Sequence, residues 1–154
     1  MTVSDLFERA VKNQIPLRDV FMGDNIPKHW FPGGYICNLD KTGNPGTHYV
    51  AVWIERNQYP VYFDPFGAHP SFEMHKALLP FYYYSAEDIQ NINSGHCGEY
   101  CLAFIQAMNV RKDLSVQLRL REFLSHWSSR PRDNLRILNA LEANQFLQRD
   151  LRSK

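Results

Sequence analysis

Hydrophobic residues have helical spacing mainly toward the two ends of the chain and form short blocks in its middle. The helical spacing predicts helices at residues 4–13, 71–79, 97–109, 116–127 and 133–149, the first with Ser4 as its N-cap. The short blocks, bounded by turn residues, predict strands at 35–39, 47–55, 61–64 and 81–85, and residues 14–31 are expected to be irregular. Strands between helices predict an α+β fold. With 154 residues, 44% of them hydrophobic, we expect a single domain over residues 1–154.

The sequence around Cys97 carries the strongest chemical signal. A predicted apolar helix follows Ser94-Gly95-His96 and begins at Cys97-Gly98. Gly95 allows a tight turn, and Gly98 allows a neighbouring segment to approach the backbone. The unpaired N–H groups and the positive dipole end of a helix N-terminus favour the thiolate, which is the nucleophilic form of cysteine.

Two further polar residues stand at the edges of predicted strands. His48 precedes an apolar run and Asp64 ends another, so the chain order is His48, Asp64, Cys97. A cysteine nucleophile needs a histidine that takes its proton and later gives one to the leaving amine, and an acid that holds the imidazole tautomer. Singly, each residue is more typical of a buried thiol, a strand histidine or an Asp-Pro turn. Their joint occurrence favours a cysteine hydrolase.

With these flanks, the chain resembles the adenovirus-type endopeptidases (adenain-like cysteine proteases), in the same group as the SUMO-specific proteases. The resemblance rests on His48-Tyr49, on the segment Phe63-Asp64-Pro65-Phe66-Gly67, and on Gln90 seven residues before Cys97-Gly98. It implies a papain-like fold in which a central helix carrying the cysteine packs on a mixed β-sheet. It also implies catalytic roles for His48, Asp64, Gln90 and Cys97, with the Gln90 amide and the Cys97 N–H stabilising the oxyanion.

The resemblance further implies a viral thiol protease, a hydrolase that cleaves capsid or core precursors at Gly-containing sites during virion maturation. Its partners would be protein substrates with small residues near the scissile bond, and we expect a monomer whose chemistry requires no cofactor. A deconjugating protease for a ubiquitin-like modifier is an alternative within the enzymes. A non-catalytic capsid- or DNA-binding module on the same fold is an alternative of another class, although such a module has no need of all four residues.

The chain departs from the family pattern at three points. Tyr49 follows the histidine where tryptophan is usual, and Asp64 is the acid of SUMO proteases where adenain carries glutamate. No cysteine lies between Asp64 and Cys97, so the disulfide-bonded peptide that activates adenain cannot be carried over. Whether DNA or another peptide activates the enzyme stays open.

Zinc is the competing chemistry for these residues. His48, His96, Cys97 and Cys101 could supply four ligands, but Cys-x-x-x-Cys is not the usual zinc spacing and no second pair follows. We therefore expect no metal, and we expect Cys37 and Cys101 to pack in the core.

The cysteine count and the apolar runs bear on location. Three cysteines without a disulfide framework are typical of an intracellular reducing compartment, which for a viral enzyme would be the host nucleus or viral factory and the virion. The sequence shows neither a secretory signal nor an apolar run of membrane-spanning length, so no membrane partner is expected.

Charge is divided unevenly along the chain. Residues 1–108 contain 7 Lys or Arg against 11 Asp or Glu, whereas residues 109–154 contain 10 against 5. Either the later helices have a solvated, ion-paired face, or they form a surface that binds the phosphates of double-stranded DNA. Adenain-like proteases use DNA as a cofactor, which favours the second interpretation. The candidate residues for it are Arg119, Arg121, Arg130 and Arg132.

Overall fold

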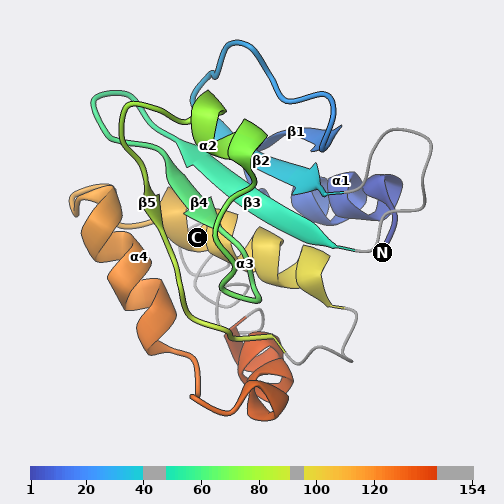
Figure 1. Ribbon diagram of the computed structural model, residues 1–154. Coiled ribbons are helices and arrows are strands. Elements are labelled where there is room, and N and C mark those ends of the chain that lie inside the picture. Colours follow the sequence, from blue (N-terminus) through green and yellow to red (C-terminus); the bar gives the residue numbers. More distant parts are fainter. Residues whose placement is uncertain (40–47, 91–95, 142–154) are drawn as a thin grey trace, which may run out of the picture.

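The computed structural model describes residues 1–39, 48–90 and 96–141, and a five-stranded mixed sheet forms its centre (Figure 1). The strands lie side by side in chain order: β1 (Leu17–Met22), β2 (Gly33–Asn38), β3 (Tyr49–Ile54), β4 (Val61–Phe63) and β5 (Tyr83–Tyr84). β3 is antiparallel to both β2 and β4, whereas β1 and β5 each run parallel to the strand beside them. The predicted α+β class is confirmed.

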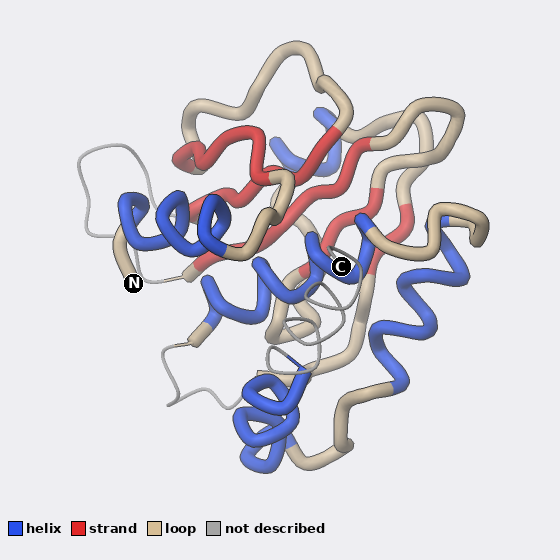
Figure 2. Tube along the Cα trace, turned by 180° about the vertical axis from the view of Figure 1, so that it is seen from behind, coloured by secondary structure: helices blue, strands red, loops and turns tan. Residues whose placement is uncertain are grey.

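Helices cover both faces of this sheet. α3 (Cys97–Asn109) crosses one face, with α1 (Val3–Lys12) and α4 (Val116–Ser125) packed beside it, and the short α2 (Phe72–Ala77) lies on the other face (Figures 1 and 2). A 3-10 turn, Pro131–Asp133, leads into helical residues 134–141. None of the helices in the described ranges is long and apolar enough to cross a membrane.

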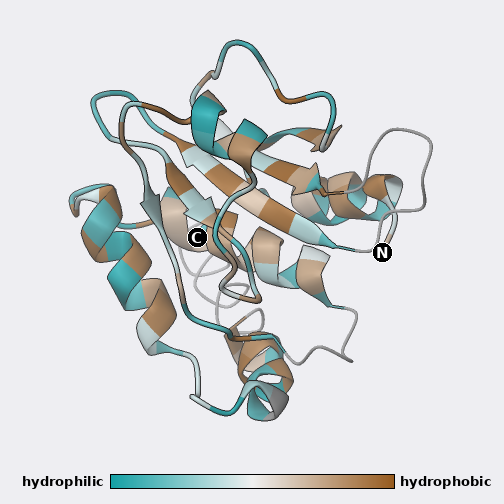
Figure 3. Cartoon of the chain, in the orientation of Figure 1, coloured by the Kyte–Doolittle hydropathy of each residue, from teal (hydrophilic) through white to brown (hydrophobic). Residues whose placement is uncertain are grey.

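The two faces of the sheet belong to two hydrophobic cores. Successive strand residues point to opposite faces, so Ala51 and Trp53 of β3 face the core under α3, whereas Val50 and Val52 face the core under α2. Hydrophobic residues accordingly run along the central strands and α3, and hydrophilic residues are frequent on the peripheral helices α2 and α4 (Figure 3). The helix that begins at Cys97 is thus the central helix of the larger core.

A glycine on β2 lets α3 lie close to the sheet. A Cβ atom at Gly34 would stand 2.5–2.8 Å from three side-chain carbons of Ile105 on α3. Gly34 pairs in register with Trp53 of β3, and its N–H donates to the carbonyl oxygen of Pro16 at 2.9 Å. A side chain here would therefore have to displace the Ile105 side chain or push α3 away from the strands.

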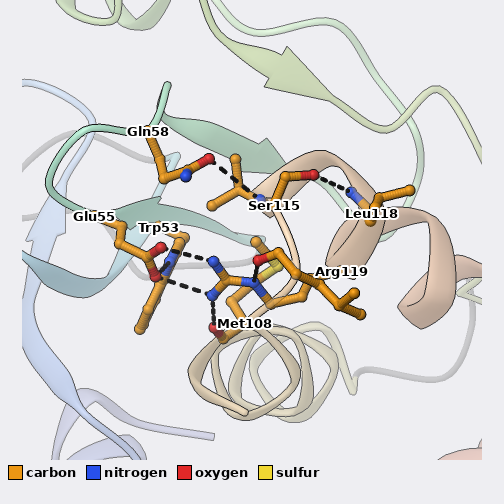
Figure 4. Close-up of polar contacts among 9 residues, drawn as sticks. Trp53, Glu55, Gln58, Met108, Ser115, Leu118 and Arg119 are labelled. Atoms are coloured by element: carbon orange, nitrogen blue, oxygen red, sulfur yellow. Dashed lines mark hydrogen bonds and ion pairs between the residues drawn. The ribbon is translucent and has the colours of Figure 1, made fainter. Parts of the chain in front are cut away.

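Arg119 of α4 joins three elements from a buried position (Figure 4). Its guanidinium, in a residue only 3% exposed, donates to the two carboxylate oxygens of Glu55 at 2.9 and 2.6 Å. It also donates to the carbonyl oxygens of Met108, near the end of α3, and of Leu114. The hydrogen bond from Arg119 is the main reason that the pKa of Glu55 is lowered. A buried charge satisfied in this way holds α3, α4 and the end of β3 together.

Two expectations about the N-terminal part are wrong. Residues 14–31 are not irregular throughout, since Leu17–Met22 forms β1. Exposed Arg18 and Asp19 obscure its apolar pattern, and the strand forms because β2 offers a parallel partner. The first helix is capped by Thr2 and not by Ser4: the Thr2 hydroxyl accepts the Asp5 N–H, and the Asp5 carboxylate accepts the Thr2 N–H.

The other predicted elements exist, with bounds that differ at their ends. α3 has the predicted limits, whereas α2, α4 and β5 are shorter than the patterns suggest. Of the helix predicted over 133–149, residues 134–141 are helical, and 142–149 lie outside the described residues. Residue 47 of the predicted strand 47–55 lies outside them as well.

The contact between Gly34 and Ile105 gives a stability prediction. Gly34→Ala should lower the free energy of unfolding by about 1–3 kcal/mol, because the added methyl group overpacks the core. On an Ile105→Ala background the same change should cost far less, because the clashing atoms are gone. Urea unfolding of the four proteins in this double-mutant cycle measures the coupling. If the losses of unfolding free energy in Gly34→Ala and Ile105→Ala simply add in the double mutant, contact with Ile105 is not the reason that alanine is unfavourable at position 34.

Candidate active site

Strand pairing brings His48 and Asp64 to one end of the sheet. His48 directly precedes β3 and Asp64 directly follows β4, and these two strands are antiparallel. α3 packs on β3, so its first residue lies at the same end: the Cys97 Sγ accepts the N–H of Tyr49 at 3.3 Å. Three of the four predicted site residues are therefore brought together.

One nitrogen of the His48 imidazole is held by Asp64. His48 Nε2 lies 2.7 Å from Asp64 Oδ1, and the same oxygen accepts the N–H of Phe66 at 2.8 Å. The side chain of Asp64 is 3% exposed and that of His48 is 16% exposed. A carboxylate can only accept, so Nε2 carries a hydrogen atom and Nδ1 is the nitrogen that remains for proton exchange. Nδ1 is buried and has no hydrogen-bond partner among the described residues.

The surroundings favour a charged thiolate–imidazolium pair. Burial alone would lower the pKa of His48, but the contacts with Asp64 and Cys97 outweigh burial and raise this pKa from 6.5 to about 9. Burial alone would raise the pKa of Cys97, but His48, followed by the Tyr49 and Gly98 N–H groups, brings it below its ordinary value. Each group thus stabilises the charged form of the other.

Gly98 has the role that its place after the cysteine predicts. A Cβ atom there would lie 3.0 Å from Leu6 Cδ2 and 3.1 Å from Met1 Sδ. The neighbouring segment that approaches the backbone is therefore α1 together with the residues before it. Tyr49 joins this contact, since its hydroxyl donates to the Met1 carbonyl oxygen at 3.1 Å. The first turn of α3 is thereby covered beside Cys97.

Gln90 is held next to the acid by backbone contacts. The N–H groups of Ile89 and Gln90 both donate to the carbonyl oxygen of Pro65, at 2.9 and 3.1 Å. The Ile89 carbonyl oxygen accepts the side-chain amide of Asn134 at 2.9 Å, so the segment is held from two sides. Gln90 is buried, while Ser94 and Gly95 lie outside the described residues. The role of Gln90 as an oxyanion donor stays a prediction.

The other two cysteines differ chemically from Cys97. Burial raises the pKa of Cys37 to about 12 and that of Cys101 well above its ordinary value. Cys37 faces the core under α2 and Cys101 the core under α3, so both pack as their positions predict. Within the described ranges, no group of three or more His, Cys, Asp and Glu side chains is arranged to hold a metal ion.

The proposed phosphate-binding arginines do not form one exposed set. Arg119 is buried, and its guanidinium is committed to Glu55 and to two carbonyl oxygens, so its inclusion is corrected: the residue holds the fold together. Arg121 and Arg130 are exposed. The side chain of Arg132 lies outside the described part of the chain. A DNA-binding surface thus stays a prediction that rests on two exposed residues and the charge division.

Two residues beside the site have roles that the sequence did not reveal. The Phe66 ring stacks on the His48 imidazole, with centroids 4.5 Å apart and planes 23° from parallel. Buried Asn134 bonds the segment that carries Gln90. Phe66 could have been suspected, because it belongs to the segment on which the family resemblance rests. Asn134 lies 45 residues from its partner Ile89 in a polar stretch, so no local pattern identifies it.

No protein-family model and no curated protein matches the chain. A function therefore has to be argued from its own residues. The described geometry provides a thiol with a lowered pKa, an imidazole with one nitrogen committed to a buried carboxylate, and a helix N-terminus at the thiol. Such a set can perform nucleophilic attack on a carbonyl carbon with proton transfer by the imidazole.

The pKa of Cys97 can be tested by alkylation. We expect iodoacetamide at pH 7 to modify Cys97 well before Cys37 and Cys101, as measured by peptide mass mapping over time. His48→Ala should raise the pKa of Cys97 and slow its modification at pH 7 by up to about tenfold, since one pKa unit changes the thiolate fraction about tenfold. His69→Ala, which changes an exposed histidine elsewhere, is the matched control. Identical rate–pH profiles for wild type and His48→Ala would contradict the ion pair.

Proposed function

We propose that the protein is a cysteine endopeptidase. The observation that carries this proposal is the position of the Cys97 thiol at the start of α3, beside an imidazole whose Nε2 is fixed by buried Asp64 at 2.7 Å. Nucleophile, base and orienting acid come from three separate parts of the chain and meet at one end of the sheet. A non-catalytic binding module has no need of this constellation.

The groups suffice for a two-step hydrolysis. The Cys97 thiolate attacks the scissile carbonyl carbon, and the electrons of the carbonyl double bond move to the oxygen. Imidazolium Nδ1 of His48 then gives its proton to the leaving amine as the C–N bond breaks, which leaves a thioester. His48 next takes a proton from water, whose hydroxyl attacks the thioester and releases the acid and the thiolate. Asp64 keeps Nε2 protonated through both steps.

The architecture supports a papain-like, adenain-like assignment. A central helix begins at the cysteine and packs on a mixed sheet whose strand ends carry the histidine and the acid, which is the arrangement that the resemblance implies. Tyr49 keeps an aromatic ring where the family usually has tryptophan, and its ring and hydroxyl pack against the start of α3 and Met1. The proposed oxyanion donors are the Cys97 N–H and the amide of Gln90.

The proposed substrates and setting follow from the same resemblance. We propose that the enzyme cleaves capsid or core precursors at Gly-containing sites during maturation of a virus particle. Release of a Gly-Gly-ending modifier is the second candidate, and Asp64, the acid typical of SUMO proteases, is the feature that favours it. Two assays distinguish these candidates. The viral endopeptidase should cleave peptides with an internal Gly-Gly, whereas the deconjugating protease should cleave conjugates of a modifier with lysine.

A glycine-ending peptide vinyl sulfone tests the nucleophile directly. The reagent should add to Cys97, located by mass mapping, and His48→Ala should lose this labelling. Cys97→Ala should abolish turnover of a Gly-Gly peptide with an unchanged circular dichroism spectrum. Cys101→Ala is the matched control and should keep activity. Labelling at another residue, or cleavage by Cys97→Ala, would show that the assignment is wrong.

Loss of the oxyanion donor should affect the transition state above all. Gln90→Ala should lower kcat by about a hundredfold or more with a modest change in KM, because the amide is engaged mainly as negative charge develops on the oxygen. Steady-state kinetics on the same peptide measures the effect. Gln106→Ala, a change at a buried glutamine in the later part of α3, is the control. A wild-type kcat in Gln90→Ala would remove Gln90 from the site.

A further inference from the structure

Phe66 contacts both members of the His48–Asp64 pair. Its ring lies nearly flat against the imidazole, 4.5 Å between centroids and 23° between planes. Its backbone N–H donates at 2.8 Å to Asp64 Oδ1, the oxygen that also bonds His48 Nε2. One residue thus fixes the acid through its main chain and the base through its side chain.

The turn that carries Phe66 is itself held firmly. The Gly67 N–H donates to the Asp64 carbonyl oxygen at 2.8 Å, which closes a tight turn over residues 64–67. Gly67 has φ +74°, and a Cβ atom there would stand 2.7 Å from the Glu87 carbonyl carbon, so only glycine fits. Pro65 in turn accepts the N–H groups of Ile89 and Gln90. The backbone of Phe66, from which the ring reaches the imidazole, is therefore held in place.

We propose that the Phe66 ring is a positioning residue for the His48 base, a role that rests on the proposed function. The Asp64 bond holds only Nε2, so it leaves the imidazole some freedom to turn about its Cβ–Cγ bond. A ring stacked on its face restricts this rotation and keeps Nδ1 directed toward Cys97. The π face of Phe66 also attracts the imidazolium more than the neutral imidazole, so it favours the protonated base.

The titrating groups around His48 define the baseline for a test. Asp64 and Cys97 act on it directly. Burial and then Asp64 raise the pKa of Asp88, and burial and then Cys97 raise the pKa of Tyr49. A change in the pH at which His48 loses its proton can be assigned to the Phe66 ring only if these groups are unaltered. Side-chain variants at position 66 meet this condition because they keep the backbone N–H to Asp64.

The experiment compares Phe66→Leu, which removes the π face, with Phe66→Tyr, which keeps it. Phe72→Leu, a change at a ring 69% exposed on α2, is the matched control. NMR titration of the His48 imidazole, assigned by comparison with His48→Ala, gives its pKa, and iodoacetamide kinetics gives the reactivity of Cys97. We expect Phe66→Leu to lower the His48 pKa and to reduce both Cys97 reactivity at pH 7 and kcat about tenfold, with little change in KM. Phe66→Tyr and Phe72→Leu should match wild type.

Two outcomes decide the matter. An unchanged His48 titration and unchanged Cys97 reactivity in folded Phe66→Leu overturn the inference, even where wild type cleaves peptide. Shifted titration with rescue by Phe66→Tyr supports it, even where no peptidase activity is found, so this inference and the proposed function can fail separately. Phe66→Met, which also lacks a π face but retains bulk, makes the same comparison if Phe66→Leu does not fold.

Discussion

The close approach of α3 to the sheet is the constraint on which the site depends. The helix is fixed at three levels: Gly98 against Leu6 at its start, Ile105 over Gly34 in its middle, and the Met108 carbonyl oxygen on Arg119 near its end. Because these contacts leave little freedom along or away from the strands, the Cys97 sulfur stays within reach of the Tyr49 N–H. The sulfur therefore lies at the end of β3 that begins directly after His48. Packing far from the thiol thus helps to determine where the Cys97 sulfur lies.

Arg119 and His48 show how the hydrogen bonds of a charged side chain relate to its role. Arg119 donates to Glu55 and to two carbonyl oxygens, so its charge is well compensated. In His48, Nε2 bonds the Asp64 carboxylate, whereas buried Nδ1 has no hydrogen bond from any residue that the structure describes. The first arrangement holds the charge in place. The second leaves one nitrogen of the imidazole available to exchange a proton.

Local sequence patterns are sufficient to predict the helix and strands that carry the site. They fail for features that depend on a contact with a distant part of the chain. The bounds of α3 and the strand edges at His48 and Asp64 follow from apolar spacing and turn residues. β1 was missed because its strand character comes from pairing with β2 and not from its own alternation. Arg119 was misjudged for a related reason. A helical arginine is usually solvated, and only the meeting of α4 with Glu55 buries it.

The separation of the site residues along the chain links chemical competence to complete folding. His48 and Asp64 are 16 residues apart, and the contact between Tyr49 and Cys97 spans 48 residues. In an extended or partly collapsed chain, Cys97 has neither the imidazolium nor the oriented N–H groups beside it, so its thiol has an ordinary acidity. The reactive thiolate arises only when the hairpin and the helix have docked. A newly synthesised chain therefore acquires its acidic thiol only once its core has closed.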